Sequence, residues 1–89
     1  MRYTVLYTPT AEQELALIWT EAVERDAVTS AAHAIDLLLA HDPETRGWPR
    51  FDTVRSLTLL PLGIDFEVAE PDRIVWVLSV WDTTKREPA

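Results

Sequence analysis

The side chains best suited to binding lie close together in one short stretch of this sequence. Residues 46–55 carry three arginines and two aromatic rings, in the order Arg46, Trp48, Arg50, Phe51 and Arg55. Basic and aromatic side chains together form stacking surfaces for nucleic acid, and tryptophan and arginine are also frequent energetic centres of protein interfaces. A loop packed over a sheet edge by its aromatic side chains is an equally common alternative. We favour a protein contact, because the helices expected nearby are acidic.

Other polar residues are weaker candidates for chemistry. His33 and His41 have no further ligand at a useful spacing, so the sequence predicts no metal site, and no cofactor is expected. Asp65, Glu67 and Asp82 have the groups needed for general acid–base chemistry. Carboxylates on a strand or turn are far more often solvated surface residues, and we expect that role here.

Net charge is distributed unevenly along the chain. Residues 12–44 contain eight acidic residues and one base, Arg25, whereas the remaining residues balance seven bases against seven acids. Phosphate backbones are held mainly by lysine and arginine, so a chain of net charge −7 is expected not to bind nucleic acid directly. A protein partner with a basic surface is more compatible with this charge.

Length and composition predict one small domain, residues 1–89, located in the cytoplasm. The chain has no cysteine, which excludes disulfides and thiolate metal sites. No apolar run approaches the ~18 residues that cross a bilayer, and residues 1–10 lack the apolar segment of a signal peptide. The hydrophobic content of 47% is sufficient for a core without crosslinks.

The hydrophobic pattern predicts a strand over residues 2–8 and then two helices. The first helix is expected to begin at Thr10 as N-cap. It buries one stripe of side chains: Ala11, Leu15, Ile18, Trp19 and Ala22. The second helix is expected to run from Asp26 as N-cap and to stop at Pro43. The short break between them predicts an antiparallel pair.

Three further strands are predicted after a loop. Residues 43–52 contain two prolines and a glycine, which is typical of a loop. Residues 53–60, 63–70 and 73–81 are β-rich, and the last of these is apolar on both faces, as expected for a central strand. The order β-α-α-β-β-β predicts an α+β fold, with the helical pair packed on one face of a mostly antiparallel four-stranded sheet.

The four tryptophans are expected to divide between core and surface. We predict that Trp19, Trp76 and one of Trp48 or Trp81 lie in the core. Trp81, at the end of the last strand, is alternatively an exposed anchor for a partner. The candidate partner-binding residues are therefore Arg46, Trp48, Arg50, Arg55 and Trp81.

Three segments resemble the RelE/ParE toxin superfamily. Residues 7–19, "YTPTAEQELALIW", resemble its first helix, which reads roughly A-x-x-x-L-x-x-I-W. Residues 54–59, "VRSLTL", resemble its R-x-L strand, and residues 63–80, "GIDFEVAEPDRIVWVLSV", resemble its closing hairpin. The resemblance implies a small bacterial toxin that an antitoxin holds inactive. RelE-like members cut mRNA in the ribosome, whereas ParE-like members poison DNA gyrase.

The nuclease residues of RelE-like members are mostly absent. The resemblance aligns their strand base with Arg55, but it places Gly63 where they have an arginine and Phe66 where they have a tyrosine. The residues after the last strand, which include Asp82, replace their arginine, histidine or tyrosine. Only Lys85 and Arg86 match a terminal basic pair. Losing the cations that stabilise a scissile phosphate removes several kcal/mol of transition-state stabilisation.

These observations predict a toxin of the ParE-like, non-nuclease type. It is expected to act by protein binding, with an antitoxin as partner and DNA gyrase or another protein as target, and it is not expected to be an enzyme. A second copy of the chain is an alternative partner. A non-toxic interaction module that kept the fold is the alternative function. A ribosome-dependent mRNA endonuclease using Arg55, Lys85 and Arg86 is a weaker alternative.

Overall fold

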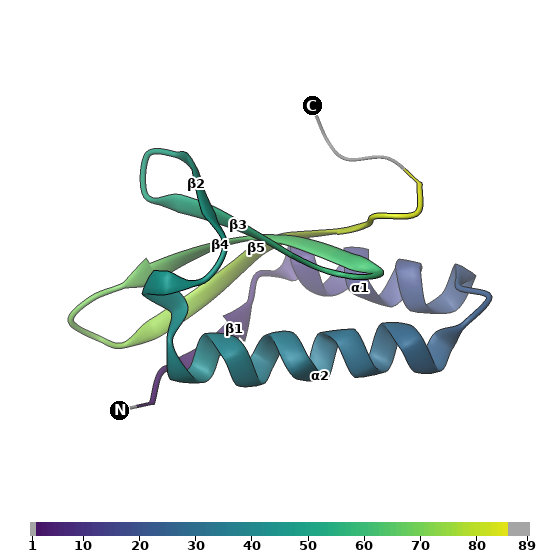
Figure 1. Ribbon diagram of the computed structural model, residues 1–89, viewed down its shortest axis with the longest axis horizontal. Coiled ribbons are helices and arrows are strands. Elements are labelled where there is room, and N and C mark those ends of the chain that lie inside the picture. Colours follow the sequence, from purple (N-terminus) through teal and green to yellow (C-terminus); the bar gives the residue numbers. More distant parts are fainter. Residues whose placement is uncertain (1, 86–89) are drawn as a thin grey trace.

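The computed structural model describes residues 2–85 (Figure 1). Its helices are α1 (Pro9–Glu21), α2 (Arg25–His41) and a short 3-10 helix, η1 (Pro43–Thr45). Its strands are β1 (Thr4–Tyr7), β2 (Trp48–Phe51), β3 (Val54–Leu59), β4 (Leu62–Ala69) and β5 (Ile74–Asp82). None of the helices within residues 2–85 combines the length and the apolar character that crossing a membrane requires.

The strands form one sheet in the order β1-β5-β4-β3-β2, and both helices cover the same face of it (Figure 1). Each strand from β2 to β5 pairs antiparallel with the next strand in the sequence. β1 pairs parallel with β5, with Thr4 opposite Ile74. The predicted α+β fold is confirmed. The expected four strands are corrected to five.

The additional strand, β2, lies in the segment predicted to be a loop. Pro49 has no backbone N–H and is paired with Arg55, and the register shifts between Pro49 and Phe51. Proline is tolerated in a sheet only at an edge or a bulge, and β2 provides both. The predicted loop is therefore corrected to an irregular edge strand, in which proline and glycine are tolerated.

The core lies between the helices and the covered face of the sheet. It joins α1 and α2 to β4 and β5 through small and branched side chains: Ala11, Val28, Ala31, Ile35, Leu39, Leu62, Ile64, Phe66, Val75, Val77 and Val80. Because side chains alternate along a strand, the residues between these on β4 and β5 face away from the helices. Within residues 2–85 no helix covers that second face, which is called the open face below.

Two of the tryptophan predictions are wrong. Trp19 is 44% exposed and lies at the rim of the helical pair, outside the core. Its ring lies under the Arg25 guanidinium, and its indole N–H donates to the Thr29 hydroxyl. Trp76 is half-buried and lies on the open face, since its neighbours Val75 and Val77 point into the core. Helical periodicity predicts which side of α1 faces the core, but it does not show that the last turn, which contains Trp19, lies at the edge of the core.

β1 covers only the first half of β5, and α1 completes the free edge beyond it. β1 pairs with Ile74–Val77. Past this point the Thr8 hydroxyl donates to the Leu78 carbonyl at 3.2 Å, and the Glu14 carboxylate accepts the Val80 N–H at 2.9 Å. A buried backbone group without a partner costs about 1–3 kcal/mol, so these contacts fix where α1 crosses the sheet.

Both predicted helix caps are displaced. Thr8 caps α1, where its hydroxyl oxygen accepts the Ala11 N–H at 3.2 Å, and Pro9 occupies the first turn, where no N–H is required. Thr10, the predicted cap, lies inside the helix and is exposed. α2 begins at Arg25 after Glu24, which makes no side-chain cap bond, so Asp26 lies in the first turn.

Thr8→Ala is expected to lower the free energy of unfolding by about 1–2 kcal/mol, because it removes both the cap and the bond to the β5 edge. Thr10→Ala is the matched control and is expected to change it by less than about 0.5 kcal/mol. Urea denaturation followed by tryptophan fluorescence measures both. Equal effects of the two variants would contradict the observed cap.

Candidate functional site

The most developed polar cluster lies on the open face and is centred on Asp65. The strand register places Asp65 directly between Ser56 on β3 and Ser79 on β5. The two serine hydroxyls donate to the carboxylate at 2.5 and 3.1 Å, and Arg50 of β2 forms an ion pair with it at 3.2 Å. The Asp65 side chain is only 14% exposed. Four strands are therefore joined through one carboxylate.

Trp81 packs against this cluster, and its ring requires a glycine at position 63. A Cβ atom on Gly63 would lie 2.4 Å from the Trp81 side chain, so only glycine allows the indole to lie against β4. The Arg50 guanidinium lies over the Trp81 ring, 5.8 Å from its centroid. Trp81 is 9% exposed, so the structure does not present it as an exposed anchor. Its buried indole nitrogen has no hydrogen-bond partner among the described residues.

The three candidate carboxylates do not form one acid–base site. Asp65 is tied to its serine and arginine partners, and Glu67 accepts a hydrogen bond from the Thr53 hydroxyl. Asp82 follows Trp81 and points to the opposite face, where the Thr84 hydroxyl donates to it at 2.6 Å. That bond holds the pKa of the Asp82 carboxyl below its usual range. Asp65 is thus structural and not the solvated residue we expected.

The weak catalytic candidates are engaged in different parts of the molecule. Arg55 precedes Ser56 and so points away from the open face, where it donates to the backbone carbonyls of Arg46 and Gly47 at 3.0 and 3.2 Å. Lys85 pairs with Glu21 of α1 at 3.3 Å. Arg86 lies outside the described residues. The structure therefore does not bring Arg55 and Lys85 together.

Phe66 is fully buried beneath the helices. The resemblance aligns a tyrosine with this position, and in this chain the position belongs to the core and not to the surface. His33 is exposed on α2, and His41 bonds the Leu37 carbonyl through Nδ1 at 2.8 Å. Within residues 2–85 no group of three His, Asp or Glu side chains is arranged to hold a metal ion.

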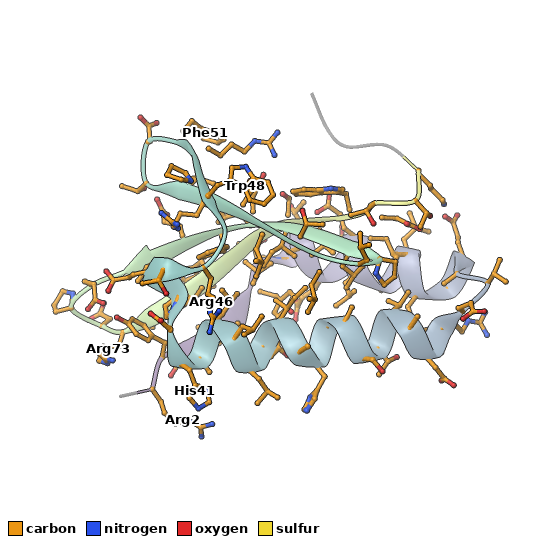
Figure 2. The ribbon with its side chains drawn as sticks, in the orientation of Figure 1. Arg2, His41, Arg46, Trp48, Phe51 and Arg73 are labelled. Atoms are coloured by element: carbon orange, nitrogen blue, oxygen red, sulfur yellow. The ribbon has the colours of Figure 1, made fainter. Side chains whose placement is uncertain are left out.

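Two exposed aromatic side chains remain on the β2–β3 hairpin. Trp48 and Phe51 lie on the part of the hairpin that rises away from the helices, whereas Arg46 lies toward α2 (Figure 2). Of the five predicted partner-binding residues, Arg46 and Trp48 are therefore exposed, and Arg50, Arg55 and Trp81 stabilise the fold. Phe51 joins Trp48 as an exposed aromatic residue, and its place in the basic stretch had indicated it.

The fold is shared with proteins of bacterial toxin–antitoxin systems. The chain is similar to one in the toxin–antitoxin complex RelBE2 from Mycobacterium tuberculosis, with 17% identity and a TM-score of 0.76 over 92% of this chain and 99% of that chain. It is similar to one in the chromosomal ParDE system from P. aeruginosa, with 20% identity and a TM-score of 0.74 over 91% and 96%. A mutant of the E. coli toxin RelE in the free state matches with 14% identity and a TM-score of 0.68 over 97% and 88%.

These similarities establish that the chain has the RelE/ParE toxin fold, as its sequence resemblance predicted. No protein-family model matches the sequence, and no curated protein matches it significantly. At this level of identity the likeness concerns the fold alone. The assignment to the ParE-like type stays a prediction.

Asp65→Asn is expected to lower the free energy of unfolding by about 2 kcal/mol. Hydrogen bonds to a charged acceptor contribute about 1.5–3 kcal/mol, and the new amide would direct a donor at Arg50, Ser56 or Ser79. Asp72→Asn, in the exposed β4–β5 turn, is the matched control and should be neutral. Urea denaturation measures both, and equal midpoints for the two variants would contradict the role of Asp65.

Proposed function

We propose that this chain is the toxin component of a type II toxin–antitoxin system. The solved structures with the same fold include toxin–antitoxin complexes of the RelBE and ParDE types, which supports a toxin with a cognate antitoxin. The chain acts in the cytoplasm, where the targets of such toxins lie. It acts by binding a protein and not by cutting mRNA.

The observation that carries the non-nuclease mechanism is the chemistry of the open face. Asp65 and Glu67 place two carboxylates there, and Arg50, the basic side chain beside them, is already paired with Asp65. Phosphoryl chemistry requires cations directed at the developing negative charge. A glycine at position 63, required by the packing of Trp81, leaves no room for a further basic side chain.

The exposed aromatic pair on the β2–β3 hairpin is the proposed target contact. Trp48 and Phe51 are both large and exposed, and they stand on an edge strand away from the helices (Figure 2). Tryptophan is a frequent energetic centre of protein interfaces, and contact with a partner would bury the exposed apolar surface of both side chains. The resemblance to ParE-like toxins makes DNA gyrase the first target to examine.

A non-toxic interaction module is the second candidate function, and the same open face favours it. An open face whose polar groups are engaged in the Asp65 cluster is compatible with a protein that has kept the fold and lost its toxicity. This alternative predicts that the chain is expressed freely and has no antitoxin gene beside its own.

Expression of the chain alone in a bacterium is expected to arrest growth, and co-expression of a short neighbouring gene is expected to restore it. The Trp48→Ala/Phe51→Ala variant should arrest growth less, because the proposed target contact is removed. Leu17→Ala removes a similarly exposed side chain from α1 and should arrest growth fully. Colony counts at equal protein levels measure the effect. Normal growth with the wild-type chain would contradict the proposal and favour the non-toxic module.

A further inference from the structure

A groove lies at the end of the molecule where the helical pair is joined. It has a volume of about 430 Å³ and lies between the α1–α2 connection, the β3–β4 turn and the residues that follow β5. Its apolar lining includes Val23 and Leu60, which are 100% and 75% exposed, and Val28 at its base. Val23 and Leu60 therefore expose apolar surface within one groove, and such surface is typical of an interaction site.

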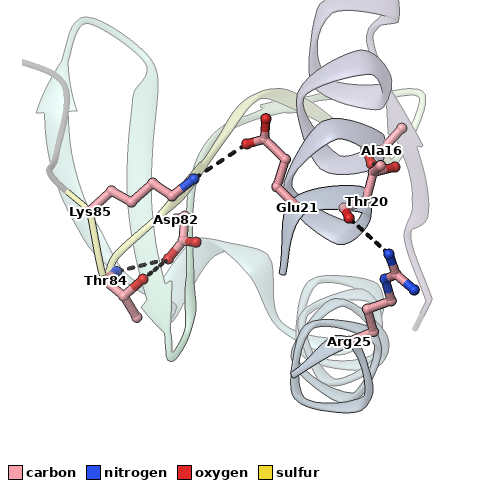
Figure 3. Close-up of polar contacts among 7 residues, drawn as sticks. All are labelled: Ala16, Thr20, Glu21, Arg25, Asp82, Thr84 and Lys85. Atoms are coloured by element: carbon pink, nitrogen blue, oxygen red, sulfur yellow. Dashed lines mark hydrogen bonds and ion pairs between the residues drawn. The ribbon is translucent and has the colours of Figure 1, made fainter. Parts of the chain in front are cut away.

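The walls of the groove are held by hydrogen bonds, so the shape is formed in advance. The backbone N–H and hydroxyl of Thr83 both donate to the Pro61 carbonyl, at 2.8 and 3.0 Å, and tie the β3–β4 turn to the end of β5. On the other wall the Arg25 guanidinium donates to the Trp19 and Thr20 carbonyls, at 3.1 and 2.9 Å (Figure 3). A pre-formed groove reduces the ordering cost of binding.

The charges around the groove are predominantly negative. Glu21, Glu24 and Asp82 line it together with one base, Lys85. A second base, Arg25, lies beside it and is bonded to the Trp19 and Thr20 carbonyls. Lys85 reaches across to Glu21, and both side chains are more than half exposed (Figure 3). An exposed ion pair of this kind contributes little to stability, so a cation from a partner can replace Lys85 at little cost.

We infer that this groove binds a basic segment of the antitoxin, which inserts an aliphatic side chain between Val23 and Leu60 and sets a lysine or arginine against Glu21 and Glu24. The inference rests on the proposed function, because it assigns the antitoxin a place on this chain. Charge complementarity selects this occupant. A second copy would bring one acidic rim against another, which like charges oppose.

A titration with designed peptides tests the chemistry of the groove directly. The full chain, labelled with ¹⁵N, is titrated with a short helical peptide of leucine, alanine and lysine, and separately with the same peptide carrying glutamate in place of lysine. We expect the lysine peptide to shift the amide signals of Val23, Ala27 and Leu60 most, and the glutamate peptide to bind at least about tenfold more weakly. Shifts centred elsewhere, or equal binding of the two peptides, would overturn the inference.

Two substitutions with matched controls locate the contacts. Leu60→Asp and Glu24→Lys should each weaken binding of the lysine peptide about tenfold or more, because each removes one of the central contacts that dominate an interface. Leu37→Asp lies on α2 about 15 Å from the groove residue Ala27 along the helix axis. Asp72→Lys lies in the exposed β4–β5 turn. Both controls should bind as the wild type does, and equal losses in controls and groove variants would overturn the inference.

Calorimetry with the neighbouring antitoxin separates this inference from the proposed function. If the antitoxin binds the wild-type chain and its affinity for Leu60→Asp is much lower, the groove is supported as the antitoxin site. Equal affinity for the wild type and Leu60→Asp overturns the groove and leaves the toxin assignment standing. If the wild-type chain neither arrests growth nor binds the product of a neighbouring gene, the proposed function fails, and with it the assignment of the occupant as an antitoxin.

Discussion

Strand β5 is hydrogen-bonded along both of its edges, and the arrangement of the other elements depends on this constraint. β4 pairs with it from Ile74 to Asp82, whereas β1 covers only the half that ends at Val77. Because the rest of that edge is completed by Thr8 and Glu14, α1 must cross the sheet beside it. The short connection then returns α2 over the same face, which closes the core.

Because both helices cover one face, the polar side chains of the other face bond to one another, beside the rings of Trp76 and Trp81. The alternation of β4 points Asp65 and Glu67 to the open face, and Ser56, Ser79 and Arg50 converge on Asp65 from three neighbouring strands. This cluster joins β2, β3, β4 and β5 and pairs Arg50, the basic side chain beside the two carboxylates, with Asp65. The remaining binding capacity lies at the margins of the molecule, in the exposed aromatic pair of the β2–β3 hairpin and in the acidic groove.

The fold class, both helices and four of the five strands, β1 and β3 to β5, could be predicted from the sequence, because hydrophobic periodicity reports which side of each element is covered. β2 could not, because Pro49 and the preceding Pro43 and Gly47 are compatible both with a loop and with an irregular edge strand. The candidate site was harder. The sequence predicted a solvated role for Asp65, because its partners come from distant strands and no local pattern indicates that Ser56 and Ser79 meet the same carboxylate.

We propose that this RelE/ParE fold, with the Asp65 cluster on its open face, acts without cutting mRNA. Mapping of mRNA 5′ ends in growth-arrested cells that express the chain is the most direct test. We expect the same distribution of ends as in cells arrested by an inhibitor that leaves mRNA intact, for the wild-type chain and for Arg55→Ala alike. New ends within coding sequences on translating ribosomes, lost in Arg55→Ala, would contradict it.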